Sequence, residues 1–150
     1  MKAAAIAGLV LAPLLGGCGF DVMYADWKVD RLCRVDGGVK IYIRDPLPDF
    51  LRREDGKIDA HQLLQGRPDH PYYLSNTQTD IIGSGARIFR WEYRLYRRAD
   101  GALLGTTVTY NRVAQNVSGP LLSKGPYVCP SGDDLTELVK GAFRTNGSTS

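Results

Sequence analysis

Two neighbouring stretches of alternating residues constrain the fold of this chain more than any other feature. Residues 87–98, RIFRWEYRLYRR, place apolar side chains on one face and mostly charged side chains on the other. This period-two pattern predicts a β-strand with one side facing solvent. The turn Ala99-Asp100-Gly101 follows, and residues 102–113, ALLGTTVTYNRV, are predicted to pair back as an antiparallel hairpin. The apolar face comprises Phe89, Trp91, Tyr93 and Leu95.

Further segments extend this hairpin into a larger fold. Residues 39–44, VKIYIR, alternate in the same way after the turn Asp36-Gly37-Gly38. Residues 49–71 predict a surface excursion with short helical pieces, and residues 72–81 a strand or a bent strand. Near the C-terminus, apolar residues recur at i, i+3, i+4, i+7 and i+8 and predict an amphipathic helix near 133–144. They are Leu135, Leu138, Val139, Ala142 and Phe143.

The sequence therefore predicts an α+β domain, in which a C-terminal helix covers an antiparallel sheet of about three to five strands. We expect Phe89, Trp91 and Tyr93 to face that helix. We also expect Asp134 and Glu137 to act as a capping pair at its start. Gly105, inside the second strand of the hairpin, predicts a bulge or a close backbone approach.

The N-terminus has the features of a secretory leader. Lys2 supplies a positive charge, and the apolar segment Ala3–Leu15 is shorter than the roughly 20 residues needed to span a bilayer as a helix. Leu15-Gly16-Gly17-Cys18 resembles the lipobox of bacterial lipoproteins, in which a leucine and two small residues precede a cysteine. The resemblance implies cleavage before Cys18, lipidation of its sulfur and acylation of its new amine. Two or more acyl chains make a stable anchor.

This leader divides the chain into four parts. We expect a signal peptide at 1–17, a lipidated N-terminus and tether at 18–32, a single globular domain at 33–144 and a flexible tail at 145–150. In the resembling family, an Asp directly after the cysteine retains the protein at the inner membrane. Gly19 stands there instead and favours the outer membrane, with the domain on its periplasmic side.

The remaining cysteines, Cys33 and Cys129, form an even pair in an oxidising compartment once Cys18 is lipidated, so a disulfide is the simplest interpretation. A two-cysteine metal site and a reactive thiol are the alternatives. The chain also resembles small proteobacterial lipoproteins of unassigned function, through Cys33-x-x-Asp36-Gly37-Gly38, Arg98-x-Asp100-Gly101-x-x-Leu104-Gly105 and Cys129-Pro130. That resemblance implies the Cys33–Cys129 bridge and no catalytic residue.

The sequence holds no pattern that predicts catalysis. Only His61 and His70 are available as a histidine base, and Gly83-Ser84-Gly85 lacks the pattern of a nucleophile elbow. Asp55 and Asp59 are interpreted as turn residues. There is no phosphate loop, dinucleotide fingerprint or calcium loop. We therefore predict no enzyme activity, no cofactor and no metal site, and the formal net charge of +3 does not favour nucleic acid as a partner.

The arginine-rich strand face is the one feature that predicts a partner. Guanidinium groups bind phosphate or carboxylate in a fork, so an anionic envelope glycan or an acidic protein is a candidate ligand. The alternative is a solvated face that discourages edge-to-edge aggregation. We expect a membrane-anchored envelope lipoprotein with a structural or accessory role, or else a periplasmic binding module or enzyme inhibitor that uses this face. The candidate residues are Arg90, Arg94, Arg98 and Arg112.

Overall fold

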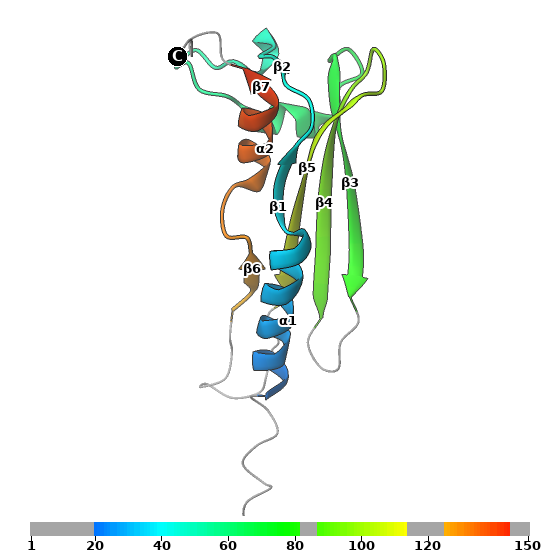
Figure 1. Ribbon diagram of the computed structural model, residues 1–150. Helices are drawn as coiled ribbons and strands as arrows, with labels where there is room; N and C mark the ends of the chain where they lie inside the picture. Colours follow the sequence, from blue (N-terminus) through cyan, green and yellow to red (C-terminus); the bar gives the residue numbers. More distant parts are fainter. Residues whose placement is uncertain (1–19, 82–86, 114–124, 145–150) are drawn as a thin grey trace, which may run out of the picture.

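A computed structural model describes residues 20–81, 87–113 and 125–144. The predicted leader, Cys18, Gly83-Ser84-Gly85 and the C-terminal tail lie outside these ranges. The fold is α+β, with an antiparallel sheet that carries one helix on each face. Figure 1 shows a long molecule in which α1 (Phe20–Asp36) runs beside the lower part of the strands and α2 (Asp134–Ala142) lies toward the other end.

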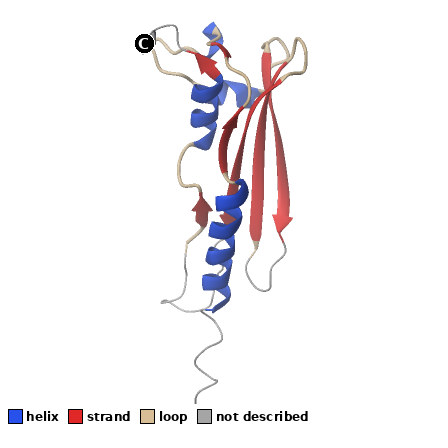
Figure 2. Ribbon diagram, viewed as in Figure 1, coloured by secondary structure: helices blue, strands red, loops and turns tan. Residues whose placement is uncertain are grey.

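The predicted hairpin forms the centre of the sheet. Strands β3 (Tyr72–Ile81), β4 (Ile88–Arg97) and β5 (Leu103–Arg112) make an antiparallel meander, shown in Figure 2. Two shorter strands share the outer edge of β5. β1 (Gly38–Ile41) pairs with residues 105–108, and β6 (Tyr127–Cys129) pairs with residues 110–112. Residues 72–81 thus form one continuous strand.

Short elements close one end of the molecule. β2 (Asp45–Pro46) pairs in parallel with β7 (Phe143–Arg144), which follows α2 directly. The predicted excursion at 49–71 contains two 3₁₀ helices, η2 (Asp49–Leu51) and η3 (Ala60–Gln65). Their buried side chains, Leu51, Ala60 and Leu63, join the core beneath α2.

The two helices pack on opposite faces of the sheet. Paired residues of antiparallel strands point to the same face, so the register separates Leu95 and Gly105 from Ile88, Val108 and Tyr110. Leu95 belongs to the core under α2, together with Leu135, Leu138, Val139 and Ala142. Ile88, Val108 and Tyr110 pack instead against Ala25, Val29 and Cys33 of α1.

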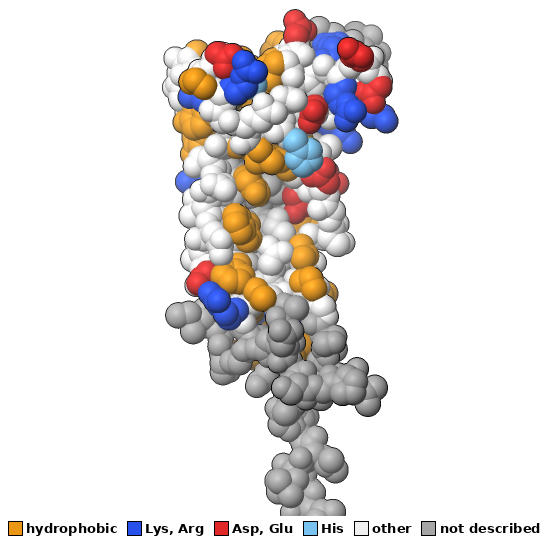
Figure 3. Space-filling view, turned by 180° about the vertical axis from the view of Figure 1, so that it is seen from behind, with side chains coloured by type: hydrophobic (Ala, Val, Ile, Leu, Met, Phe, Trp, Pro, Cys, Tyr) orange, Lys and Arg blue, Asp and Glu red, His pale blue; other side chains and the backbone are white. Residues whose placement is uncertain are grey.

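The aromatic face of β4 is only partly covered. Of the three aromatic residues expected to face α2, Tyr93 packs against the core under that helix, together with Leu95. Phe89 and Trp91 are half-buried and belong to neither core cluster. α2 has only nine residues and packs on β1 and β5. Figure 3, viewed from behind, shows hydrophobic side chains at several points along the molecule, with most charged side chains toward its upper end.

The predicted tether at 18–32 is wrong where the structure describes it, because residues 20–36 form α1. Val22, Ala25, Val29 and Cys33 are buried at the helical spacing i, i+3, i+7 and i+11. The small Ala and Cys side chains give this spacing a weak apolar signal. Helix α1 is also stabilised by polar contacts with sheet residues that are distant in sequence. A local sequence pattern does not reveal such contacts.

Candidate functional site

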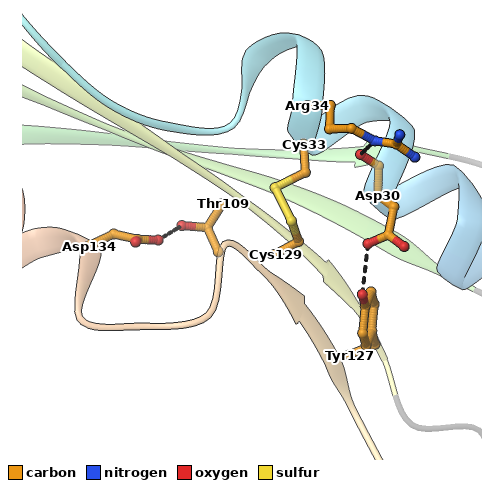
Figure 4. Close-up of a disulfide and its surroundings, with 7 residues drawn as sticks. All are labelled: Asp30, Cys33, Arg34, Thr109, Tyr127, Cys129 and Asp134. Carbon is orange, nitrogen blue, oxygen red and sulfur yellow. Dashed lines mark hydrogen bonds between the residues drawn. A yellow bond between two sulfur atoms is a disulfide. The ribbon is translucent and has the colours of Figure 1, made fainter.

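The disulfide predicted from the cysteine count is confirmed. Cys33, in the last turn of α1, is bonded to Cys129 in β6, and their Cα atoms lie 6.0 Å apart. Figure 4 shows the bridge between the helix and the short edge strand. It closes a separation of 96 residues and joins the first described element to the segment that leads into α2.

Acidic residues on the inner side of α1 reinforce this attachment. The Tyr127 hydroxyl donates to the Asp30 carboxylate at 2.7 Å, one turn from the disulfide (Figure 4). This hydrogen bond raises the pKa of Tyr127, because it stabilises the protonated phenol. Asp26 accepts a short hydrogen bond from Nε of Arg112. Helix α1 is therefore fixed along its length by polar contacts as well as by the covalent bridge.

Arg112, one of the four candidate arginines, is buried with only 2% of its surface exposed. In addition to the Asp26 carboxylate, its guanidinium donates to the carbonyl oxygen of Gly125 at 3.0 Å and to that of Val113 at 3.3 Å. These contacts pair the buried charge and use donors on all three nitrogens. Arg112 therefore attaches α1 to the sheet and does not reach the molecular surface.

Arg90 is also held within the domain. Its Nε and Nη2 donate to Oδ2 of Asp36, at 2.9 and 2.7 Å, while Nη1 donates to Glu92. The same Asp36 oxygen accepts from the Tyr110 hydroxyl. Burial alone would raise the pKa of Asp36, but the hydrogen bond and charge of Arg90 lower it overall. Asp36, at the end of α1, is thereby linked to both central strands.

Arg94 and Arg98 are the two candidates that remain exposed. Nε of Arg94 donates to Glu92 at 2.7 Å, yet 47% of the Arg94 side chain is accessible. This bond and that from Arg90 lower the pKa of Glu92 although partial burial opposes them. Arg98 donates to the carbonyl oxygen of His70 at 2.9 Å, and its guanidinium lies over the ring of Tyr73 at 4.7 Å.

The structure thus separates the four candidate arginines into two pairs. Arg90 and Arg112 bind carboxylates of α1, whereas Arg94 and Arg98 are exposed to solvent. The acidic partners of these arginines were not predicted from the sequence. A sequence signal for them was present, because the acidic residues lie in a segment whose apolar residues have helical spacing. These residues are Asp26, Asp30 and Asp36.

The residues considered for catalysis have local roles. Asp59 caps η3 by accepting from the backbone N–H of His61, and Asp55 accepts from that of Lys57, as expected of turn residues. The His70 ring stacks on Phe50, with centroids 4.1 Å apart. An open pocket of about 470 Å³ lies beside η2 and is lined by both acidic and basic side chains. Within the described ranges, no three metal-ligating side chains cluster together.

Among the described helices, none is both long enough and apolar enough to cross a bilayer. No protein-family model matches this chain, and comparisons with curated proteins and with solved structures found no match.

Proposed function

We propose that this protein is an envelope lipoprotein with a structural or accessory role, held to a membrane through acyl chains on Cys18. The observation that carries the proposal is the disulfide between Cys33 and Cys129, because such bonds persist in oxidising compartments. The lipobox-like Leu15-Gly16-Gly17-Cys18 supplies the independent sequence support. The proposal assigns the domain to the periplasmic side of the outer membrane and gives it no catalytic role.

The arrangement of charges supports an accessory role over capture of an anionic ligand by the whole arginine face. Arg90 and Arg112 use their guanidinium groups to hold α1. Freeing Arg112 for a ligand would break a largely buried pair with Asp26, and freeing Arg90 would leave Asp36 only its longer ion pair with Lys40, at 3.6 Å. A binding module would therefore depend on Arg94 and Arg98, which are the exposed members of the set.

The anchor is tested by mass spectrometry of protein extracted from membranes. We expect an N-terminal peptide that begins at Cys18 and carries acyl chains. A soluble mature protein with a free Cys18 thiol would contradict the proposal. Replacement of Cys18 by serine is the matched control, because it removes the lipidated sulfur and retains Gly16 and Gly17.

The role is tested by affinity capture from solubilised envelope at low and high salt. Retention of one protein partner through high salt supports the accessory role. Exposed charges are screened within about 10 Å at 0.1 M salt, so capture of an anionic glycan should fail at high salt. If that capture also disappears in Arg94→Ala/Arg98→Ala, the binding-module alternative replaces the accessory role.

A further inference from the structure

The side of α1 that points away from the sheet exposes an unusual set of large apolar side chains. Met23, Tyr24 and Trp27 have 61%, 52% and 48% of their surfaces accessible, and Val35 has 80%. On the helix they lie opposite the buried Val22, Ala25, Val29 and Cys33. We call the exposed set, together with two exposed arginines, the outward face of α1: Met23, Tyr24, Trp27, Arg31, Arg34 and Val35.

The charge on this face has one sign. Among the described α1 side chains, residues 22–36, each aspartate is bonded to the sheet: Asp26 to Arg112, Asp30 to Tyr127 and Asp36 to Arg90. The charged members of the outward face are Arg31 and Arg34. The contacts that dock the helix thus direct Asp26, Asp30 and Asp36 toward the sheet, and both charged members of the outward face are cations.

Aromatic and basic groups are also arranged together on this face. The rings of Tyr24 and Trp27 lie 5.7 Å apart, and the Arg31 guanidinium lies 5.5 Å from the centre of the Trp27 ring. Trp and Tyr prefer the headgroup level of a bilayer, where the ring body is apolar and its polar edge is hydrated. Arginine forks match lipid phosphates.

The position of α1 in the chain indicates which surface this face meets. The helix begins at Phe20, two residues after Cys18, a separation of at most about 7 Å of extended chain. If Cys18 carries the acyl chains of the proposed function, the first turns of α1 start at the headgroup level. Figure 1 shows the N-terminal end of α1 at the lower end of the described fold, away from α2.

We propose that the outward face of α1 is a membrane-contact surface that lies on an anionic phospholipid bilayer. Trp27 and Tyr24 enter the headgroup region, and Arg31 and Arg34 bind lipid phosphates. The inference rests on the proposed function, since the anchor at Cys18 brings the face to the bilayer. Because α1 is fixed to the sheet, this contact also orients the domain, and the face that carries α2 points away from the membrane.

One experiment measures the lipid anchor at Cys18 and the membrane contact of the outward face separately on the same sample. Full-chain protein carrying Trp91→Phe, so that Trp27 is the only tryptophan, is extracted from membranes and reconstituted into vesicles. The vesicles contain phosphatidylcholine alone, or with phosphatidylglycerol, and lipids brominated near the headgroup end of the acyl chain. Flotation and the mass of the Cys18 peptide report the anchor, and bromine quenching of Trp27 reports the outward face.

We expect flotation in both lipid mixtures and strong quenching of Trp27 in the anionic vesicles. In Arg31→Glu/Arg34→Glu, flotation should persist, while the ratio of quenched to unquenched Trp27 falls by about fivefold or more per arginine. Arg52→Glu/Arg53→Glu is the matched control, because it makes the same charge change beside η2 and should retain full quenching.

The other outcomes show whether the contact surface, the anchor or both are wrong. Flotation with unquenched Trp27, or quenching unaffected by Arg31→Glu/Arg34→Glu, overturns the contact surface and leaves the anchor in place. Quenching of Trp27 with an unacylated Cys18 supports the contact surface and rejects the anchor. An unacylated Cys18 together with unquenched Trp27 rejects both.

Discussion

At the scale of single residues, Asp45 shows how one carboxylate organises an end of the fold. It is buried in β2 and accepts from Nε and Nη2 of Arg97, at 2.9 and 2.8 Å, and from the Tyr72 hydroxyl at 2.9 Å. The hydrogen bond from Arg97 is the main cause of the lowered pKa of Asp45. Three segments distant in sequence therefore meet at one ion pair.

Asp45→Asn should lower the free energy of unfolding by about 2–3 kcal/mol, because Arg97 keeps its charge and loses a largely buried partner. Asp100→Asn is the matched control. Asp100 faces the same arginine at 2.7 Å, but its side chain is 51% exposed, so its loss should cost less than about 1 kcal/mol. Urea denaturation of both variants measures the difference, and equal losses would contradict the importance of burial.

Acid should destabilise the protein through Asp36, Asp45 and Glu92, whose pKa values are all lowered in the folded state. Their contribution to stability is complete above the ordinary carboxyl pKa near 4 and is lost as the pH falls through the lower folded values. Asp134 acts in the opposite direction, because burial raises its pKa despite the hydroxyl of Thr109. The free energy of unfolding, measured from pH 6 to pH 2, should therefore decrease once the pH is lower than about 4. This decrease should be less steep in Asp45→Asn, which lacks one of the three carboxyl groups.

At the scale of elements, the sequence predicted those parts whose stabilising contacts follow a local period. β4 and β5 fall within the predicted hairpin, and α2 within the predicted helix. The cap of α2 was misplaced by one residue, since Asp133 accepts from the backbone N–H of Thr136. Asp134 instead accepts from the Thr109 hydroxyl at 2.7 Å, a tertiary contact that the spacing of acids does not distinguish from a cap.

The parts of the candidate site that could not be predicted depend on contacts between segments distant in sequence. Alternation assigned Arg90 and Arg94 to one face of β4, and the structure places them so. Whether an arginine on that face stays free depends on what packs over it, and α1 brings Asp36 to Arg90 from 54 residues away. Trp91 is half-buried because α2 is short. The alternation of a strand predicts which face a side chain is on, but not how much of that face a helix covers.

Gly105 provides a test of the contact between α2 and the sheet. The predicted close approach is present: a Cβ at this position would lie 2.8 Å from the Lys40 carbonyl oxygen and 2.9 Å from Cδ1 of Leu138. β5 also has its register shift beside this residue. Gly105→Ala should cost about 1–3 kcal/mol of stability, because backbone must move to admit the methyl group.

The control for this substitution is Gly125→Ala, since a Cβ at Gly125 meets nothing within 4 Å. Thermal unfolding of the two variants side by side should show a clear loss for Gly105→Ala and little change for Gly125→Ala. Comparable melting temperatures for Gly105→Ala and the unmodified protein would show that β1 and α2 can move away from β5 without loss of stability.

At the scale of the whole molecule, the sheet divides two cores that are stabilised in different ways. The core under α2 is mainly aliphatic and includes Leu51, Leu95, Leu104 and Leu138. The core under α1 is smaller and is supplemented by the disulfide and by the ion pair of Arg112. Because these cores lie on opposite faces, we expect α1 to respond to a change in its own attachments more than α2 does.

Removal of the disulfide in Cys33→Ser/Cys129→Ser tests this division. In the chain-entropy model, a closed loop of roughly 100 residues contributes about 4.7 kcal/mol, so a loss of about 3–5 kcal/mol is expected. The loss of protection against hydrogen exchange should differ along the chain, since the bridge ends on α1 and on the edge strand β6. Hydrogen exchange should accelerate most in α1 and β6 and least at the β4–β5 pairing and in α2.

Asp45→Asn is the control for that pattern, because it weakens the opposite end of the molecule, where β2 pairs with β7. Its accelerated exchange should appear around β2, β7 and the end of β4, with α1 retaining its protection. If both variants instead accelerate exchange uniformly, the domain opens as one cooperative unit. In that case the bridge would stabilise the fold by closing the unfolded chain, without a particular role in holding α1 to the sheet.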